Sequence, residues 1–248
     1  MKDPVRLDDL NVNNLKIYQN TEGFCFGTDA VLLAWYASLK KFNNVCDLCT
    51  GNGVVPLLLS VNHCFKTAVG IELLQEQTSL AEQSVTLNKL EDKIKIINGN
   101  IKNIKEILPS GCVDLVTVNP PYSTNGSGFI AQGDRSYARM ELCCTLQDVI
   151  YAGSYLLKNS GRFCMVHKPE RLVDIFCAMR QNNIEPKKLL LVIPKRGREP
   201  ILILTEGRKE GKSGLTVEKP LYIYKDGEGS IYTKELKEIY KQQQNIVK

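Results

Sequence analysis

The chain has 248 residues, 43% of them hydrophobic and 24% charged, with a formal net charge of +5. This composition excludes disorder, collagen and coiled coil as descriptions of the whole chain. Residues 1–179 carry a net charge of −1 and residues 180–248 a net charge of +6, so the positive excess, which permits a polyanionic partner, lies in the last quarter.

The chain begins with a polar stretch, and residues 1–25 are expected to form an arm with short strands. Thr28 and Asp29 precede the apolar run 30–37 and offer side-chain oxygens to the first amides of a helix. Strands and helices then alternate. Strands are expected over 45–48, 68–72, 94–97, 113–118, 161–166, 188–193 and 201–204, and helices over 54–61, 73–88, 101–108, 146–157 and 171–182.

This alternation predicts βαβ units and a mainly parallel sheet, whose carboxyl ends share one edge where ligands bind. A loop is expected over 123–133 and hairpin turns over 207–213 and 226–230. We expect a single domain over 1–248, with the arm at 1–25, a core at 26–205 and a basic extension at 206–248.

Nine cysteines, an odd number spread through apolar runs, indicate reduced thiols rather than a disulfide framework. Cys46 and Cys49 form a CxxC pair, but a second pair at zinc-ribbon spacing is missing from the sequence, so no metal is expected. The chain also has neither a charged-then-apolar leader nor 18 uninterrupted apolar residues. A cytoplasmic protein without a membrane span is therefore expected.

The first chemical motif follows the strand at 45–48 and reads Asp47-Leu-Cys-Thr-Gly-Asn-Gly53. Its glycines let the backbone approach a ligand closely, while a Walker lysine and a third glycine of GxGxxG are both absent from the sequence. Glu72 ends the next strand, where an acid accepts hydrogen bonds from ribose hydroxyls. Together these features suit a charged nucleoside without a pyrophosphate, such as S-adenosylmethionine. The alternative is a tight turn beside a solvated acid.

The second motif, Asn119-Pro120-Pro121-Tyr122, directly follows the strand at 113–118. Two prolines fix the backbone and remove amide donors, which leaves the Asn119 side-chain oxygen and the Pro120 carbonyl to accept from an exocyclic amine. Tyr122 offers a ring on which a planar base stacks. The alternative is a proline-rich turn with a capping asparagine.

Together these motifs resemble those of class I, Rossmann-like amino methyltransferases that use S-adenosylmethionine, over about residues 25–205. Three further stretches, 26–34, 145–150 and 161–172, resemble the bacterial tRNA1(Val) adenine-37 N6-methyltransferases over nearly the whole chain. The resemblance implies a mainly parallel seven-stranded sheet flanked by helices and methylation of an adenine amine beside a tRNA anticodon. It also places Thr28 and Asp29 against the methionine portion of the cofactor.

The expected site residues are these. The catalytic residues are Asn119, Pro120, Pro121 and Tyr122; the cofactor-binding residues are Thr28, Asp29, Asp47, Thr50, Gly51, Asn52, Gly53, Glu72, Asn100, Ile101 and Asn119; the RNA-binding residues are Arg135, Arg139, Lys168, Arg171, Lys195, Arg196 and Arg198. Clustered cations of this kind hold phosphates, although each one is also compatible with an ordinary solvated surface.

The chain departs from the family pattern at two positions, with Cys49 where a glycine is usual and Asn100 where an aspartate is usual. His167 is expected to be structural or to contact RNA, and Tyr222, Tyr224 and Tyr232 to pack in a hairpin. Three alternative functions remain from the residues: a glutamine-N5 methyltransferase of release factors, a ribosomal RNA guanine-N2 methyltransferase, and a catalytically silent RNA-binding module.

Overall fold

The computed structural model describes residues 4–22, 25–61, 64–121, 144–227 and 229–242. Tyr122, Arg135, Arg139 and the loop predicted over 123–133 lie outside the described residues. The strands are β1 (Val5–Asp9), β2 (Lys16–Asn20), β3 (Asn44–Leu48), β4 (Thr67–Glu72), β5 (Ile94–Asn98), β6 (Val113–Val118), β7 (Leu157–His167), β8 (Ile184–Ile193), β9 (Leu202–Lys209), β10 (Thr216–Val217) and β11 (Leu221–Tyr222).

The central sheet confirms the expected fold class. Its seven longer strands lie in the order β5-β4-β3-β6-β7-β9-β8, which is 3-2-1-4-5-7-6 when the strands are counted from β3. Strand β9 runs antiparallel to β7 and β8, whereas β3 to β7 pair in parallel. The two-residue strands β10 and β11 both pair in parallel with β8, which brings the sheet to nine strands.

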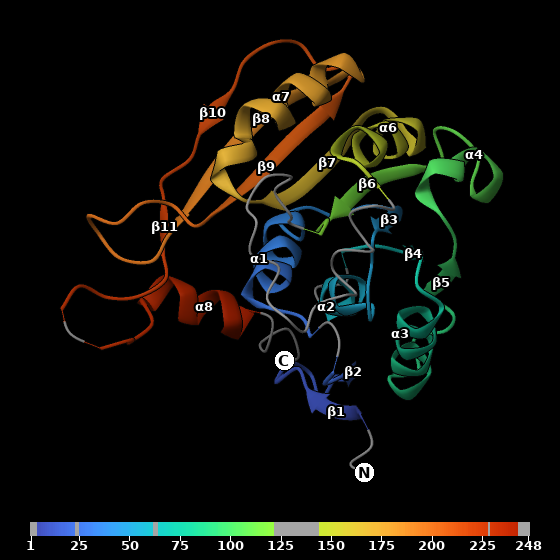
Figure 1. The fold of residues 1–248 in the computed structure, drawn as a ribbon, viewed down its shortest axis with the longest axis horizontal. Coiled ribbons are helices and arrows are strands. Elements are labelled where there is room, and N and C mark those ends of the chain that lie inside the picture. The colour runs from blue at the N-terminus through green and yellow to red at the C-terminus, as the bar shows by residue number, and fades with distance from the viewer. Residues whose placement is uncertain (1–3, 23–24, 62–63, 122–143, 228, 243–248) are drawn as a thin grey trace.

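Helices cover both faces of this sheet (Figure 1). They are α1 (Thr28–Ala37), α2 (Val54–Val61), α3 (Gln75–Leu87), α4 (Ile104–Ile107), α6 (Leu146–Leu156), α7 (Leu172–Gln181) and α8 (Lys234–Gln242), with short 3-10 turns η1 (Ile101–Asn103) and η2 (Pro169–Arg171). Side chains of α1, α2, α3 and α8 share one buried apolar cluster, and those of α4, α6 and α7 share the other.

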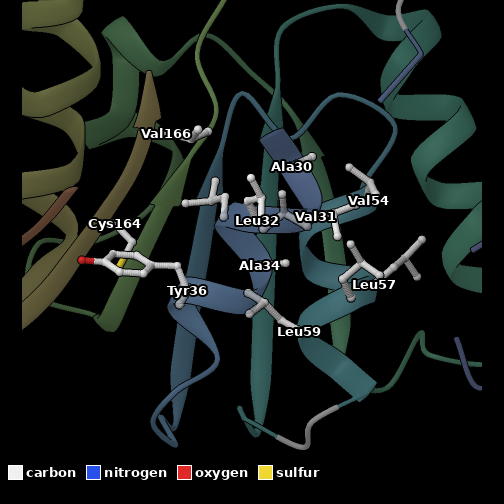
Figure 2. Close-up of a cluster of buried hydrophobic side chains, with 14 of the residues drawn as sticks. Ala30, Val31, Leu32, Ala34, Tyr36, Val54, Leu57, Leu59, Cys164 and Val166 are labelled. Carbon is white, nitrogen blue, oxygen red and sulfur yellow. The ribbon is translucent and has the colours of Figure 1, made fainter. Parts of the chain in front are cut away.

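Helix α1 is buried along most of its length because it packs against β6, β7, α2 and α8. Figure 2 shows Val31 beside Val54 of α2, and Tyr36 beside Cys164 of β7. Each fully buried aliphatic side chain of this size stabilises the fold by about 1.5–3 kcal/mol. The start of α1 is therefore held firmly, and this start contains Thr28 and Asp29.

Several predicted boundaries differ from the structure. Strands β7 and β8 each begin four residues earlier than predicted, at Leu157 and Ile184, because they pair with long neighbours. The hairpin predicted at 207–213 is wrong, since β9 continues to Lys209 and the next strand, β10, pairs with β8 instead. The reversal predicted at 226–230 is confirmed by the hydrogen bond from the Lys225 amide to the Ile231 carbonyl at 2.8 Å.

The arm and the C-terminal segment both pack on the core. Strands β1 and β2 form an antiparallel hairpin, and the amide of Tyr18 donates to Oγ of Ser84 in α3 at 2.9 Å. In α8, Leu236 and Ile239 are buried in the same cluster as α1. Across the described part of the chain, we find no helix with the length and apolarity that crossing a membrane requires.

Candidate active site

The residues predicted to bind the cofactor gather at the carboxyl edge of the parallel strands. The glycine loop follows β3, Glu72 is the last residue of β4, Asn100 follows β5 and Asn119 follows β6. Because β3, β4, β5 and β6 are parallel, all four positions lie at one edge of the sheet. The structure therefore brings together the two motifs that lie about seventy residues apart in the sequence.

The glycine loop has a left-handed backbone at three positions. Gly51 and Gly53 have φ values of 57° and 82°, and Cys49 has a φ of 56°. Glycine adopts this conformation without a steric cost, whereas a side chain at such a position strains the backbone. This geometry suits the glycine that the family resemblance leads us to expect at the position of Cys49.

Asp47 braces the glycine loop against β6. Its Oδ2 accepts a hydrogen bond from the Thr50 hydroxyl and its Oδ1 accepts one from the Thr117 hydroxyl, both at 2.6 Å. The side chain is only 2% exposed. Burial raises the pKa of Asp47 to about 7, and the hydrogen bonds from the two hydroxyls partly oppose this rise. Thr117 was not among the residues predicted from the sequence.

Glu72 joins the tip of β4 to the glycine loop. Its Oε2 accepts from the amide of Gly51 and its Oε1 from the amide of Leu74, both at 2.9 Å. Burial raises the pKa of Glu72, and these backbone donors oppose the rise. Each carboxylate oxygen has a second lone pair, so both remain able to accept from a further hydroxyl.

A hollow lies beside Glu72. It is lined by Cys49, Ile71, Glu72, Leu73, Gly99, Asn100, Ile101, Pro121 and Cys144. Within it, Asn100 caps the turn η1, because its Oδ1 accepts from the Lys102 amide at 3.0 Å. The Nδ2 group of Asn100 can donate to a ligand, and its Oδ1 keeps a second lone pair. Cys144 was not predicted, since nothing in its local sequence links it to the glycine loop.

Asn119, which follows β6, contacts Asp29 at the start of α1. The Asn119 Nδ2 donates to Oδ2 of Asp29 at 3.2 Å, and Oδ1 of Asp29 accepts from the Ala30 amide at 2.8 Å. Next to Asp29, the Thr28 hydroxyl accepts from the Tyr240 hydroxyl at 3.4 Å. The C-terminal helix α8 therefore contacts the start of α1 beside the second motif.

The side chain of Asn52 faces the arm. Its Nδ2 donates to the Tyr18 carbonyl at 3.4 Å and to Oε1 of Gln19 at 3.5 Å. The Gln19 Oε1 also accepts from the Phe26 amide at 3.0 Å, so this buried glutamine links the arm to the segment before α1. The sequence prediction missed Gln19. A signal was available, because it alternates with Ile17 on the inward face of a short strand.

The predicted cations lie beyond strands that end at the same edge. Lys168 and Arg171 follow β7, and residues 195–198 follow β8, which runs parallel to β7. Lys195 donates to the carbonyls of Gly227 and Gly229 at 3.0 and 2.7 Å, so its ammonium holds the 226–230 reversal. Arg171 pairs with Asp174 at 2.7 Å. Arg196 and Arg198 are exposed.

His167 ends β7 as a neutral side chain. Burial, followed by the charge of Arg171, lowers its pKa to about 4, and Nδ1 accepts from the Lys168 amide at 2.8 Å. A neutral ring with Nδ1 as acceptor carries its proton on Nε2. Among the residues that the structure describes, we find no cluster of three His, Cys, Asp or Glu side chains suited to a metal ion.

Comparison with solved structures confirms the fold. A predicted O-methyltransferase from Agrobacterium tumefaciens superposes with a TM-score of 0.71, at 18% identity over 87% of this chain and 97% of that one. Geranyl diphosphate C-methyltransferase from Streptomyces coelicolor superposes with a TM-score of 0.55 at 11% identity, over 73% of this chain and 80% of that one. These superpositions show that the chain has the Rossmann-like fold of class I methyltransferases.

Curated sequences narrow this class to a family. A tRNA1(Val) (adenine(37)-N6)-methyltransferase of Histophilus somni is 30% identical over 80% of this chain and 81% of its own length. Enzymes of the same name from Porphyromonas gingivalis and Trichodesmium erythraeum are 27% and 24% identical, over 73% and 80% of this chain and 73% and 84% of their own lengths. No protein-family model matches the chain. The chain belongs to the tRNA1(Val) (adenine(37)-N6)-methyltransferase family.

Proposed function

We propose that this enzyme transfers a methyl group to the exocyclic N6 amine of an adenine in tRNA, namely adenine 37 of a valine tRNA. The observation that carries the proposal is the Asn119-Pro120-Pro121 turn at the end of β6, with Pro121 lining the hollow beside Glu72. The names of the family relatives support tRNA as the acceptor.

The hollow and its rim suit the cofactor. Glu72 has lone pairs for two ribose hydroxyls, Asn100 and Ile101 flank the space for the adenine, and the left-handed turns at Gly51 and Gly53 let the ligand approach the backbone. When bound, S-adenosylmethionine supplies an electrophilic methyl group. We assign Asp47 and Thr50 to bracing the loop, because the hydroxyls of Thr50 and Thr117 occupy the buried carboxylate. Thr28 stays a predicted contact for the methionine portion.

The second motif orients the acceptor amine. The Asn119 side-chain oxygen and the Pro120 carbonyl accept its two N–H groups, so the lone pair of the amine points away from both. An amine held in this way needs no general base before it attacks the methyl group, and the extra proton on the methylated nitrogen is lost to water afterwards. Orientation of this kind lowers a barrier by at most about 7–11 kcal/mol. Stacking of the base on Tyr122 stays a prediction from the sequence.

A tRNA anticodon loop presents its bases at low cost, because they are already unpaired. The cations beyond β7 and β8 lie at the same edge as Asn119 and provide contacts for the phosphates on either side of the target base. Of the predicted set, Arg196 and Arg198 suit this role well because they are exposed.

The test is to incubate the enzyme with labelled cofactor and unmodified tRNA transcripts, and to map the modified nucleotide by mass spectrometry. We expect N6-methyladenine at position 37, and a loss of at least about 100-fold in rate for Asn119→Ala with unchanged melting temperature and cofactor affinity. Release factors and ribosomal particles serve as competing acceptors. Label in either of them, but not in tRNA, would overturn the proposal, and a wild-type protein that binds no cofactor in calorimetry would favour the silent RNA-binding module.

A further inference from the structure

Asp29 accepts a hydrogen bond from the Asn119 side chain. Its two carboxylate oxygens have separate partners. Oδ1 accepts from the Ala30 amide at 2.8 Å, and Oδ2 accepts from Nδ2 of Asn119 at 3.2 Å. The backbone amide of Ala30 is a fixed donor, so the carboxylate has a defined orientation before Asn119 reaches it.

A carboxylate determines which way a facing amide must turn. An ionised aspartate is an acceptor at both oxygens, so the group that faces it has to be a donor. Asn119 therefore presents its NH2 to Asp29 and directs its oxygen away from Asp29. The amine of the acceptor is also a donor, so this is the amide orientation that the proposed reaction needs.

The surroundings of Asp29 keep its carboxylate in place. A side chain on Gly27, the N-cap of α1, would bring a Cβ within 2.9 Å of the Asp29 Oδ1, so a glycine at this position leaves room for the carboxylate. Helix α1 is anchored by buried side chains on the sheet, and Tyr240 of α8 contacts the adjacent Thr28. Asp29 thus belongs to a rigid element while Asn119 belongs to a turn.

We propose that Asp29 is a positioning residue, which fixes the Asn119 amide with its oxygen toward the acceptor amine. This role rests on the proposed function and differs from the contact to the methionine portion that the family resemblance implies. It requires the negative charge of Asp29, and not merely a side chain of the same size.

The decisive variant is Asp29→Asn, which preserves size but has a single oxygen. If that oxygen stays on the Ala30 amide, the introduced NH2 faces Asn119, and the Asn119 amide must flip to offer its oxygen. The flipped amide then presents a donor to the acceptor amine. We expect kcat to fall by about 100-fold or more, with little change in cofactor affinity measured by calorimetry.

Two further variants separate positioning from simple loss of a contact. Asp29→Ala removes the partner without imposing a flip, so we expect a smaller loss of about tenfold, the effect of one hydrogen bond. Asn119→Asp alone places two carboxylates against each other and is expected to be nearly inactive. The exchange Asp29→Asn with Asn119→Asp restores a donor facing an acceptor, leaves an oxygen toward the amine, and is expected to recover at least tenfold over either single variant.

The result that overturns the role is equal activity of Asp29→Asn and Asp29→Ala, or no recovery in the exchange variant. A rise in the cofactor dissociation constant of both Asp29 variants, with kcat maintained, would instead assign Asp29 to cofactor binding.

The wild-type enzyme is assayed on tRNA in parallel as the control for the proposed function. Failure of the wild type to methylate tRNA would refute the proposed function, whereas success with unaffected Asp29→Asn would refute only the positioning role. Melting temperatures and the Asn119 side-chain amide signal in NMR spectra report whether each variant folds and whether the amide has turned.

Discussion

The backbone amide of Gly51 donates a hydrogen bond of 2.9 Å to Oε2 of Glu72. Through this contact, the acid at the tip of β4 holds the glycine loop that follows β3. Glu72 also accepts from the Leu74 amide, where it satisfies a donor at the start of α3. One buried carboxylate therefore connects the glycine loop to the start of α3.

Replacing Glu72 with glutamine is expected to loosen the loop, because the Gly51 and Leu74 amides donate to different oxygens and glutamine has only one. A buried donor left without an acceptor costs about 1–3 kcal/mol. We expect faster hydrogen exchange at the Gly51 amide and at least about tenfold weaker binding of S-adenosylhomocysteine in calorimetry. Glu82→Gln, which changes an exposed acid on α3, is the matched control. Unchanged exchange at Gly51 would contradict the bracing role.

Cys49→Gly is expected to stabilise the protein. Cys49 has a φ of 56°, in the left-handed region, and relieving a side chain there is worth about 1 kcal/mol. Cys112→Gly is the control, since Cys112 is not among the described residues with positive φ and the added chain freedom should destabilise it. Chemical denaturation of both variants measures the effect. A destabilised Cys49→Gly variant would show that the thiol contributes more than the backbone strain costs.

Asp47 predicts a pH dependence of stability. Its pKa in the folded state is raised to about 7, above the ordinary value, so the folded protein binds a proton that the unfolded chain releases. The unfolding free energy should therefore decrease as the pH rises from about 4 to 7, by up to about 1.4 kcal/mol per pH unit. The nearby carboxylate of Glu72 reinforces this trend.

The Asp47→Asn variant isolates this effect, because an amide keeps an acceptor and a donor for the two threonine hydroxyls without a charge. We expect it to match or exceed wild-type stability at pH 8 and to lose part of the slope between pH 5 and 7. Urea titrations across this range provide the measurement. An identical slope in the variant and the wild type would mean that Asp47 ionises normally.

Arg198→Ala is expected to weaken tRNA binding and to reduce its salt dependence. Loss of one phosphate contact to single-stranded RNA lowers the slope of log K against log salt by about 0.7. Arg180→Ala is the matched control, because Arg180 pairs with Glu185 at 2.7 Å near the end of α7. Filter binding at several salt concentrations distinguishes them. Equal slopes for the two variants would remove Arg198 from the interface.

Much of the central sheet was predictable because its strands are short apolar runs between helices with clear boundaries. Helix α2 and strand β6 have the predicted bounds, Val54–Val61 and Val113–Val118. The prediction failed before Lys188 and after Leu204, where long-range pairing extends β8 and β9 past their apolar segments. Polar residues enter those strands because neighbouring strands satisfy their backbone groups, and local patterns do not record this pairing.

For the site, the sequence by itself determined the two motifs and their place at the ends of parallel strands, because residue types and spacing carry that information. Only the tertiary structure decided what each polar group contacts. It turned Asn52 toward Gln19, enclosed Asp47 between Thr50 and Thr117, and set Asp29 against Asn119 across 90 residues of sequence. Hydrogen bonds between distant segments depend on how helices and strands pack, so no local pattern specifies them.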